Sequence, residues 1–317
     1  SGQVGVSLVR ASEIEPEPIR WLWEGQLAKG KIHILGGKPG TSKTTIAMSL
    51  SAIVSTGGKL PDGKRCPSGN VLVWSGEDDP KDTLVPRLIA NGADKNRVFF
   101  VDATVDESGQ RLPFDPSRDI PRLEAAGKEL GDVALLVVDP IVSAVGGDGN
   151  SNSEVRRDLQ PLVDLAVSLD CAVLGITHFT KGSGGQAAVD RITGSLAFGA
   201  LARVIHVCFR PKDPIDGEFA FMRGKSNISA VGGGFLYDIE QVLLPGTVIE
   251  ASRIKWRGGI SGLAEEALAK AEADEKDKPA LELAKEFLND RLADGPMQVV
   301  DLIAEAKADG ISDSTLH

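Results

Sequence analysis

Short apolar runs alternate with longer amphipathic segments along the first two thirds of the chain. Six runs have the length of a buried strand, at residues 32–35, 70–74, 98–101, 134–138, 172–176 and 204–209. Segments with helical periodicity lie between the first five, at residues 44–55, 83–91, 120–130 and 153–169. Strands that alternate with helices predict right-handed βαβ units, and therefore a largely parallel sheet that is covered on both faces.

Three further runs with strand character have no helices between them, at residues 217–223, 234–239 and 247–253. Consecutive strands joined by short connections pair antiparallel. We therefore expect an α/β fold in which a mostly parallel sheet carries an antiparallel extension at one edge.

The composition changes after residues 257–259. Residues 264–278 are mainly Ala, Glu, Lys and Asp, which predicts a solvated helix or a flexible linker. An amphipathic helix is predicted from residue 279, because apolar side chains recur there at helical spacing. They are Leu281, Ala284, Leu288 and Leu292. A second helix over residues 299–307 makes this small unit similar to the start of a winged helix-turn-helix, which we expect to be truncated within its third helix.

Composition restricts the class of protein. Apolar residues make up 42% and charged residues 25% of the chain, which excludes disordered, collagen-like and coiled-coil classes. The longest aliphatic run, residues 133–138, is far shorter than the roughly 20 residues of a membrane-spanning helix. No membrane partner is therefore expected. Three widely separated cysteines without metal-ligand spacing indicate a reduced, cytoplasmic protein.

The net charge of −10 is unevenly distributed. Residues 261–317 carry 14 acidic and 6 basic residues, whereas residues 1–260 carry 31 acidic and 29 basic residues. A broad basic surface is therefore not expected. Any contact with nucleic acid would be confined to a loop or to the lining of a ring.

A glycine-rich segment between the first strand and the first helix carries the strongest chemical signal. It reads Gly-Gly-Lys-Pro-Gly-Thr-Ser-Lys-Thr from Gly36 to Thr44, in the strand–loop–helix context that a P-loop requires. Small residues let backbone N–H groups surround a β-phosphate, and Lys43 would reach the β- and γ-phosphates of ATP. The predicted nucleotide-binding residues are Gly37, Lys38, Pro39, Gly40, Thr41, Ser42, Lys43, Thr44 and Thr45. The alternative is a glycine-rich turn that binds nothing.

Ser42 departs from the usual P-loop pattern, which has glycine before the lysine. Serine carries a Cβ, so either the backbone angle at this position tolerates it or the loop geometry is shifted. We expect the change to affect nucleotide affinity without removing binding.

Two apolar strands end in carboxylates. Asp139 ends the run at residues 134–138, and together with the Thr44 hydroxyl it is predicted to hold Mg²⁺. The alternative for Asp139 is an ordinary turn residue at the end of a buried strand. Glu77 follows the run at residues 70–74 and is predicted to act as the catalytic base or to orient the attacking water. The next two residues, Asp78 and Asp79, are interpreted as turn and helix N-cap residues.

His178 also stands at the end of a strand, where it could contact the γ-phosphate and report its loss to the loop that follows. The alternative is a structural histidine. The loop from Lys181 to Arg191 is rich in glycine and small residues. We interpret it either as a mobile linker or as a loop in which Lys181 and Arg191 contact DNA.

These motifs, in this order, resemble the RepA-like branch of RecA-fold ATPases, which includes plasmid and phage hexameric helicases and AAA family ATPases of mobile elements. The resemblance rests on the P-loop and on the segments around Glu77, Asp139 and His178, and it covers about residues 18–257. Together with the composition change after residues 257–259, it divides the chain into an N-terminal segment 1–17, a RecA-like ATPase domain 18–258, a linker or solvated helix 259–278, and the helical unit 279–317.

The resemblance also implies a ring, usually a hexamer, in which neighbouring subunits complete each ATP site. Arg203 matches the position of a trans-acting arginine finger, and Lys225 matches a second cation that reaches the γ-phosphate from the adjacent subunit. The other interpretations are a charge at a strand end for Arg203 and a solvated hairpin residue for Lys225. Single-stranded DNA is the expected ligand of the channel.

Two other functions compete with a hexameric helicase or translocase. One is a regulatory or adaptor ATPase whose nucleotide state controls binding to a partner such as a primase or a replication initiator. The other is a P-loop kinase, but the sequence has no helical lid with clustered arginines. Glu77 and His178 also suit the positioning of a water better than transfer to an acceptor.

Overall fold

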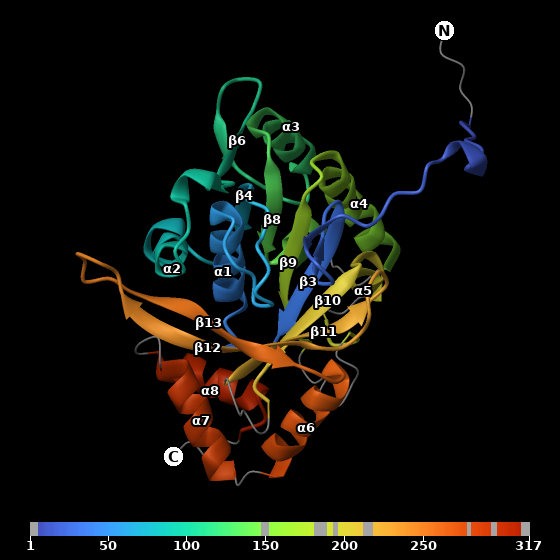
Figure 1. Cartoon of the computed structure of the whole chain (residues 1–317). Coiled ribbons are helices and arrows are strands. Elements are labelled where there is room, and N and C mark those ends of the chain that lie inside the picture. Colours follow the sequence, from blue (N-terminus) through green and yellow to red (C-terminus); the bar gives the residue numbers. More distant parts are fainter. Residues whose placement is uncertain are drawn as a thin grey trace.

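The computed structural model describes residues 6–146, 152–180, 189–192, 196–211, 218–277, 280–292 and 297–311. Within these residues the main sheet has nine strands in the order β13-β12-β11-β10-β3-β9-β8-β4-β5 (Figure 1). Six of the strands are parallel: β3 (Lys31–Gly37), β4 (Asn70–Ser75), β5 (Val98–Phe100), β8 (Val133–Asp139), β9 (Ala172–His178) and β10 (Val204–Phe209). The predicted parallel core is confirmed.

The antiparallel extension is also confirmed. It consists of β11 (Phe219–Ser226), β12 (Gly234–Leu243) and β13 (Glu250–Ile260). In β13 the pair Gly258 and Gly259 continues the strand, and Gly259 is paired with Phe235, so the sheet extends to Ile260. The composition change at residues 257–259 therefore falls inside a strand.

Helices cover both faces of the parallel strands (Figure 1). Their bounds are α1 (Lys43–Thr56), α2 (Val85–Ala90), α3 (Ile120–Leu130), α4 (Asn152–Ser168) and α5 (Leu196–Leu201), and a π-helical turn, η2 (Pro80–Leu84), precedes α2. Side chains along β4 alternate between two cores: Val71 and Val73 pack with α1 and α2, whereas Leu72 and Trp74 pack with α3 and α4. This alternation follows from the two-residue period of a strand.

Two small hairpins accompany the sheet. One is β1 (Trp21–Trp23) with β2 (Leu27–Ala28), and the other is β6 (Ala103–Val105) with β7 (Arg111–Pro113). Trp23 is fully buried and stacks on Phe221 at 5.7 Å between ring centroids, so the first hairpin covers the core as part of the fold. Residues 6–19, with the short 3-10 helix η1 (Ala11–Glu13), are exposed and extend away from the body (Figure 1).

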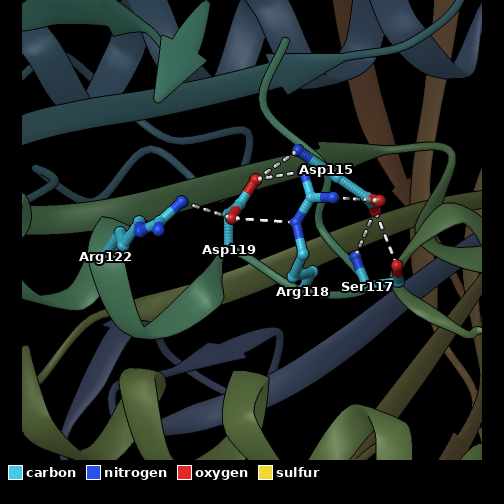
Figure 2. Close-up of polar contacts among 5 residues, drawn as sticks. All are labelled: Asp115, Ser117, Arg118, Asp119 and Arg122. Atoms are coloured by element: carbon cyan, nitrogen blue, oxygen red, sulfur yellow. Dashed lines mark hydrogen bonds and ion pairs between the residues drawn. The ribbon is translucent and has the colours of Figure 1, made fainter. Parts of the chain in front are cut away.

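A buried carboxylate fixes the turn between β7 and α3. Asp119 is 1% exposed, and it accepts hydrogen bonds from the Asp115 backbone N–H, from Arg118 and from Arg122 (Figure 2). Hydrogen bonds from the Arg118 guanidinium hold the pKa of Asp119 below its usual value. The charge pairs organise the entrance to α3.

Three helices follow the sheet: α6 (Ala264–Asp277), α7 (Ala280–Leu292) and α8 (Val299–Ala308). They lie together beyond β12 and β13 (Figure 1). Ala264 and Leu268 of α6 are buried against Val207 of β10 and Met222 of β11. The segment predicted as a solvated helix or linker is therefore a helix that is docked on the sheet.

The helices α7 and α8 contact each other, and Arg291 of α7 pairs with Glu305 of α8 at 2.9 Å. Residues 293–296 and the predicted third helix from residue 312 onward lie outside the described residues. None of the helices in the described part of the chain combines the length and the apolar character needed to cross a membrane.

Candidate nucleotide-binding site

The predicted P-loop connects β3 to α1. At the end of β3, Gly37 is paired with Cys208 of β10 on one side and with His178 of β9 on the other. A Cβ at Gly37 would lie 2.6 Å from the Cys208 carbonyl oxygen, so only glycine allows this close approach. The loop is thus anchored in the middle of the sheet, at the carboxyl ends of the parallel strands. Ligands of open α/β sheets bind at this edge.

Ser42 occupies the left-handed region, with φ 51° and ψ 40°. A non-glycine residue in this region has a cost of roughly 1–2 kcal/mol. The preference of P-loops for glycine at this position therefore has a direct backbone explanation here. Serine adopts the left-handed angle here, so the departure from glycine carries an energetic cost within the loop.

Lys43 is 5% exposed and folds back into the loop. Its Nζ donates to the Gly37 carbonyl at 3.2 Å and to the Lys38 carbonyl at 3.0 Å. Burial lowers the pKa of Lys43 to about 8, against the opposing effect of nearby acidic groups that include Asp139 and Glu77. The ammonium group therefore remains mostly protonated at neutral pH, as binding of an anionic phosphate requires.

Asp139, the last residue of β8, contacts Thr44 in the first turn of α1. The Thr44 hydroxyl donates to Asp139 Oδ2 at 2.7 Å, and Asp139 is 3% exposed. Burial raises the pKa of Asp139 to about 6, helped by the charges of Glu77 and Asp78, so the carboxylate is mostly ionised at neutral pH.

This hydroxyl–carboxylate pair fits Mg²⁺, a hard cation that is commonly held by one or two protein oxygens together with substrate phosphates and water. No group of three or more His, Cys, Asp and Glu side chains within the described residues could hold a metal by itself. Thr44 and Asp139 would therefore hold Mg²⁺ jointly with the nucleotide.

The strand order brings Glu77 and His178 to the same edge. Strand β9 lies between β3 and β8, and β4 is next to β8, so His178 and Glu77 end strands that flank Asp139. Their side chains approach to 4.0 Å between Nε2 and Oε2, and each is about half exposed. Burial, with a contribution from Lys43, lowers the pKa of His178 to about 4, so its imidazole is neutral at neutral pH.

The two carboxylates after Glu77 have structural partners. Asp78 pairs with Arg87 of α2 at 2.8 Å, and Asp79 caps the turn at Pro80 by accepting from the Lys81 backbone N–H at 2.7 Å. Both positions agree with their prediction as turn and cap residues. Glu77 is thus the carboxylate of this group whose side chain faces His178.

The Arg191 side chain is buried, whereas a side chain that contacts DNA has to be accessible at the surface. Arg191 is 3% exposed, its guanidinium stacks on Phe179 at 4.4 Å, and it pairs with Glu272 of α6 at 2.6 Å. The expectation that Arg191 contacts DNA is therefore corrected, because its charge is buried and compensated inside the subunit. Lys181 and the rest of the predicted loop up to residue 188 lie outside the described residues.

Arg203 and Lys225 lie at the opposite end of the sheet from the P-loop. The backbone N–H of Arg203 bonds the Ile32 carbonyl near the start of β3, and Lys225 is paired with Ile205. From Ile32 to Gly37 the strand spans about 16 Å at roughly 3.3 Å per residue. The Arg203 side chain is exposed, whereas Lys225 is half-buried and its Nζ donates to the Gly199 carbonyl at 2.5 Å. Neither is positioned to serve the P-loop of its own chain.

Two residues of the antiparallel extension contact the P-loop unit and have no counterpart in the sequence predictions. The Tyr237 hydroxyl donates to the Thr41 carbonyl at 2.7 Å, and Trp256 Nε1 donates to Ser49 Oγ of α1 at 3.1 Å. Neither residue belongs to a motif. The one available signal is that the chain contains a single tyrosine, which gives no indication of its partner.

The fold and the site define a P-loop nucleotide-binding protein with a RecA-like α/β sheet. The chain belongs to the AAA domain family, whose sequence profile matches residues 4–184. A search of curated proteins found no match. Family membership supports nucleotide binding and ATPase activity.

Proposed function

We propose that the protein is a Mg²⁺-dependent ATPase that works as a ring, with active sites shared between neighbouring copies. Binding would use the backbone N–H groups of the loop, Lys43 and the helix N-terminus at α1. Thr44 and Asp139 would hold Mg²⁺, which neutralises charge on the phosphates when bound. Their contact at 2.7 Å supports this role.

Glu77 would orient and deprotonate the attacking water, and neutral His178 would donate a hydrogen bond to the γ-phosphate. The 4.0 Å approach of the two side chains supports a linked action: loss of the phosphate contact at His178 would be felt at Glu77 and in the segment after β9. Asp78 is paired with Arg87, which leaves Glu77 as the acid best placed for this task.

The proposal of a ring rests on the distance between the P-loop and the two cations, Arg203 and Lys225, that are predicted to act on the γ-phosphate. The P-loop lies at the carboxyl edge, whereas Arg203 is exposed near Ile32, at the other edge. A second copy packed head to tail would bring Arg203 and Lys225 of one copy toward the phosphates of the next. Such a heterologous contact closes into a ring when the rotation permits. Lys225 would have to leave the Gly199 carbonyl to take part.

The substrate of the motor, on this proposal, is single-stranded DNA in the channel of a hexamer. The resemblance of the P-loop and strand-end motifs to RepA-like helicases supports this proposal. Residues 1–260 carry almost balanced charge, so DNA binding in the channel would depend on a few cations from each of the six copies. The test is the rate of ATP hydrolysis with and without single-stranded DNA, together with the solution mass from light scattering. We expect a mass near six subunits with Mg-ATP and a several-fold stimulation by DNA.

A second candidate is a nucleotide-switched adaptor that acts on a primase or replication initiator. The inward position of Arg191 favours it, because one of the two cations predicted to contact DNA is neutralised by Glu272. In the same experiment, ATP-dependent assembly without any DNA stimulation supports the adaptor. A monomer that hydrolyses ATP at full rate argues against active sites that are shared between copies.

A further inference from the structure

The P-loop accepts a hydrogen bond from a side chain of the antiparallel extension. Tyr237 is fully buried on β12, and its hydroxyl donates to the Thr41 carbonyl at 2.7 Å. Thr41 is 5% exposed, and its own hydroxyl donates to the Lys38 carbonyl at 2.9 Å. A contact from β12, nearly 200 residues further along the chain, therefore reaches the centre of the phosphate loop.

The tyrosine ring is firmly placed. It stacks on Phe219 of the paired strand with 5.4 Å between ring centroids, and it contacts Trp256 at 5.8 Å. Burial raises the pKa of Tyr237 well above its usual value, so the hydroxyl stays protonated and available as a donor. A phenol fixed in this way directs its hydrogen bond to one point of the loop.

The bonded carbonyl belongs to the peptide unit that precedes Ser42. In a trans peptide the C=O and N–H groups point in opposite directions, so holding the Thr41 carbonyl toward β12 turns the Ser42 N–H away from β12. The orientation of this peptide also determines φ of Ser42, which is 51° and therefore in the left-handed region that disfavours serine. The hydrogen bond thus acts on the one peptide of the loop whose conformation is unfavourable for its residue.

We infer that Tyr237 is a positioning residue of the P-loop, whose hydroxyl holds the Thr41–Ser42 peptide in the orientation that presents the Ser42 N–H to a phosphate group and offsets the left-handed backbone of Ser42. The inference rests on the proposed nucleotide site. It assigns to the antiparallel extension a role in phosphate binding, in addition to its role in the sheet.

The test compares the affinity of the full chain for the fluorescent nucleotide N-methylanthraniloyl-ADP with Mg²⁺. Tyr237→Phe keeps the ring and its packing but removes the donor. We expect Kd to rise about five- to tenfold, the usual range for the loss of one buried hydrogen bond. The free energy of unfolding, measured with urea, is followed in parallel so that a loss of stability is separated from a loss of affinity.

Rescue distinguishes positioning from packing. Glycine adopts the left-handed conformation without steric cost, so Ser42→Gly in the Tyr237→Phe background should bring Kd back to within about twofold of the parent. Ser42→Gly alone is the reference for the double variant: removing the Tyr237 hydroxyl should change Kd by less than about twofold in the Ser42→Gly background, against five- to tenfold in the parent. Ser49→Ala is the matched control, since it removes the acceptor of Trp256 in α1; it should lower stability and leave Kd unchanged.

Each outcome decides the question. If the parent chain binds no nucleotide, the proposed function and the role of Tyr237 fall together. If the parent binds and Tyr237→Phe binds equally well, the role of Tyr237 is overturned while the proposed function stands. If Tyr237→Phe binds nucleotide more weakly and Ser42→Gly does not restore the affinity, the inference is also overturned. The loss of affinity would then be an effect of packing.

Discussion

The guanidinium of Arg191 lies 2.6 Å from the carboxylate of Glu272, so a residue that follows β9 is paired with a residue of α6. The two side chains are 3% and 13% exposed, and the guanidinium also stacks on Phe179, the residue after His178. A buried pair that loses one partner leaves an uncompensated charge. The pair therefore ties the docking of α6 to the strand end that carries His178.

We expect Glu272→Gln to lower the free energy of unfolding by about 3 kcal/mol, because Arg191 would keep its buried charge without a compensating carboxylate. Hydrogen exchange of the α6 amides should become faster, which identifies the helix that is released. The matched control is Glu266→Gln on the exposed side of α6, with an expected change below about 0.5 kcal/mol. Equal effects of the two variants would contradict the role of the buried pair.

The catalytic assignment of Glu77 predicts a separation of binding from hydrolysis. Glu77→Gln keeps the size of the side chain and removes the base, so the rate of ATP hydrolysis should fall by about 100-fold or more. Nucleotide affinity should stay within about threefold of the parent, because Glu77 is not among the groups proposed to bind phosphate. Lys43→Ala is the reference variant and should lose both. Hydrolysis by Glu77→Gln at the parental rate would assign the water to another group.

The sequence was sufficient to predict the nine strands of the main sheet and the chemical groups at the ends of its parallel strands. Each parallel strand has an apolar run long enough to be recognised. Asp139 directly follows such a run, and His178 stands two residues after another. Parallel strands present their carboxyl ends on one edge, so the meeting of these side chains with the P-loop could be expected. The position of β9 between β3 and β8 could not be predicted, because strand order depends on tertiary packing and leaves no local pattern in the sequence.

The contacts that were not predicted join residues far apart in the chain. Arg191 and its partner Glu272 are separated by 80 residues in the chain. Glu272 lies in a segment so poor in large apolar residues that its composition predicts a solvated helix or a flexible linker. Small side chains bury one side of that helix: Ala264 and Leu268 are buried, and Ala267 and Ala271 pack partly buried beside them. Tyr237 likewise has no local signal for its bond to Thr41, because a backbone carbonyl carries no side-chain identity.

A buried histidine makes stability depend on pH. His33 Nε2 accepts from the Ala28 backbone N–H at 2.9 Å and Nδ1 bonds the Val173 carbonyl at 3.1 Å, so a second proton has no place in the folded state. Burial lowers the pKa of His33 to about 4, from 6.5. The unfolded chain therefore takes up a proton between these values that the folded chain does not. Stability should be unaffected by His33 above pH 6.5 and fall as the pH drops toward 4.

The size of this effect is about 1.4 kcal/mol per pH unit for one proton in the middle of the window. We expect the urea-unfolding free energy of the parent to show this slope in addition to that of its other groups. His33→Gln, although less stable at neutral pH, should show a slope smaller by about one proton between pH 4.5 and 6. Identical slopes for the two proteins would mean that His33 is protonated as easily in the fold as in the unfolded chain. His206 is also buried, and its pKa is lowered by burial and by the charge of His33, so the difference between the two slopes includes any change in the titration of His206.

The proposed sharing of sites between subunits predicts complementation between two inactive variants. Arg203→Ala keeps its own P-loop but supplies no cation to its neighbour, whereas Lys43→Ala supplies Arg203 but cannot hold ATP. Each alone should hydrolyse ATP at less than about 5% of the parental rate, given the 10³–10⁵-fold effect of arginine fingers. In a random mixture about a quarter of the heterologous contacts join an intact P-loop to an intact Arg203, so the rate should recover toward that fraction.

The control for complementation replaces Lys43→Ala by a subunit that carries both substitutions. This subunit still assembles but contributes neither group, so its mixture with Arg203→Ala should remain inactive, and light scattering should show rings in both mixtures. Because Arg203 lies level with Ile32, at the opposite edge from its own Gly37, recovery in the first mixture and not in the second can arise only across a contact between copies. Equal inactivity of both mixtures, with assembly intact, would assign Arg203 to the stability of its own strand end and remove the basis for a shared active site.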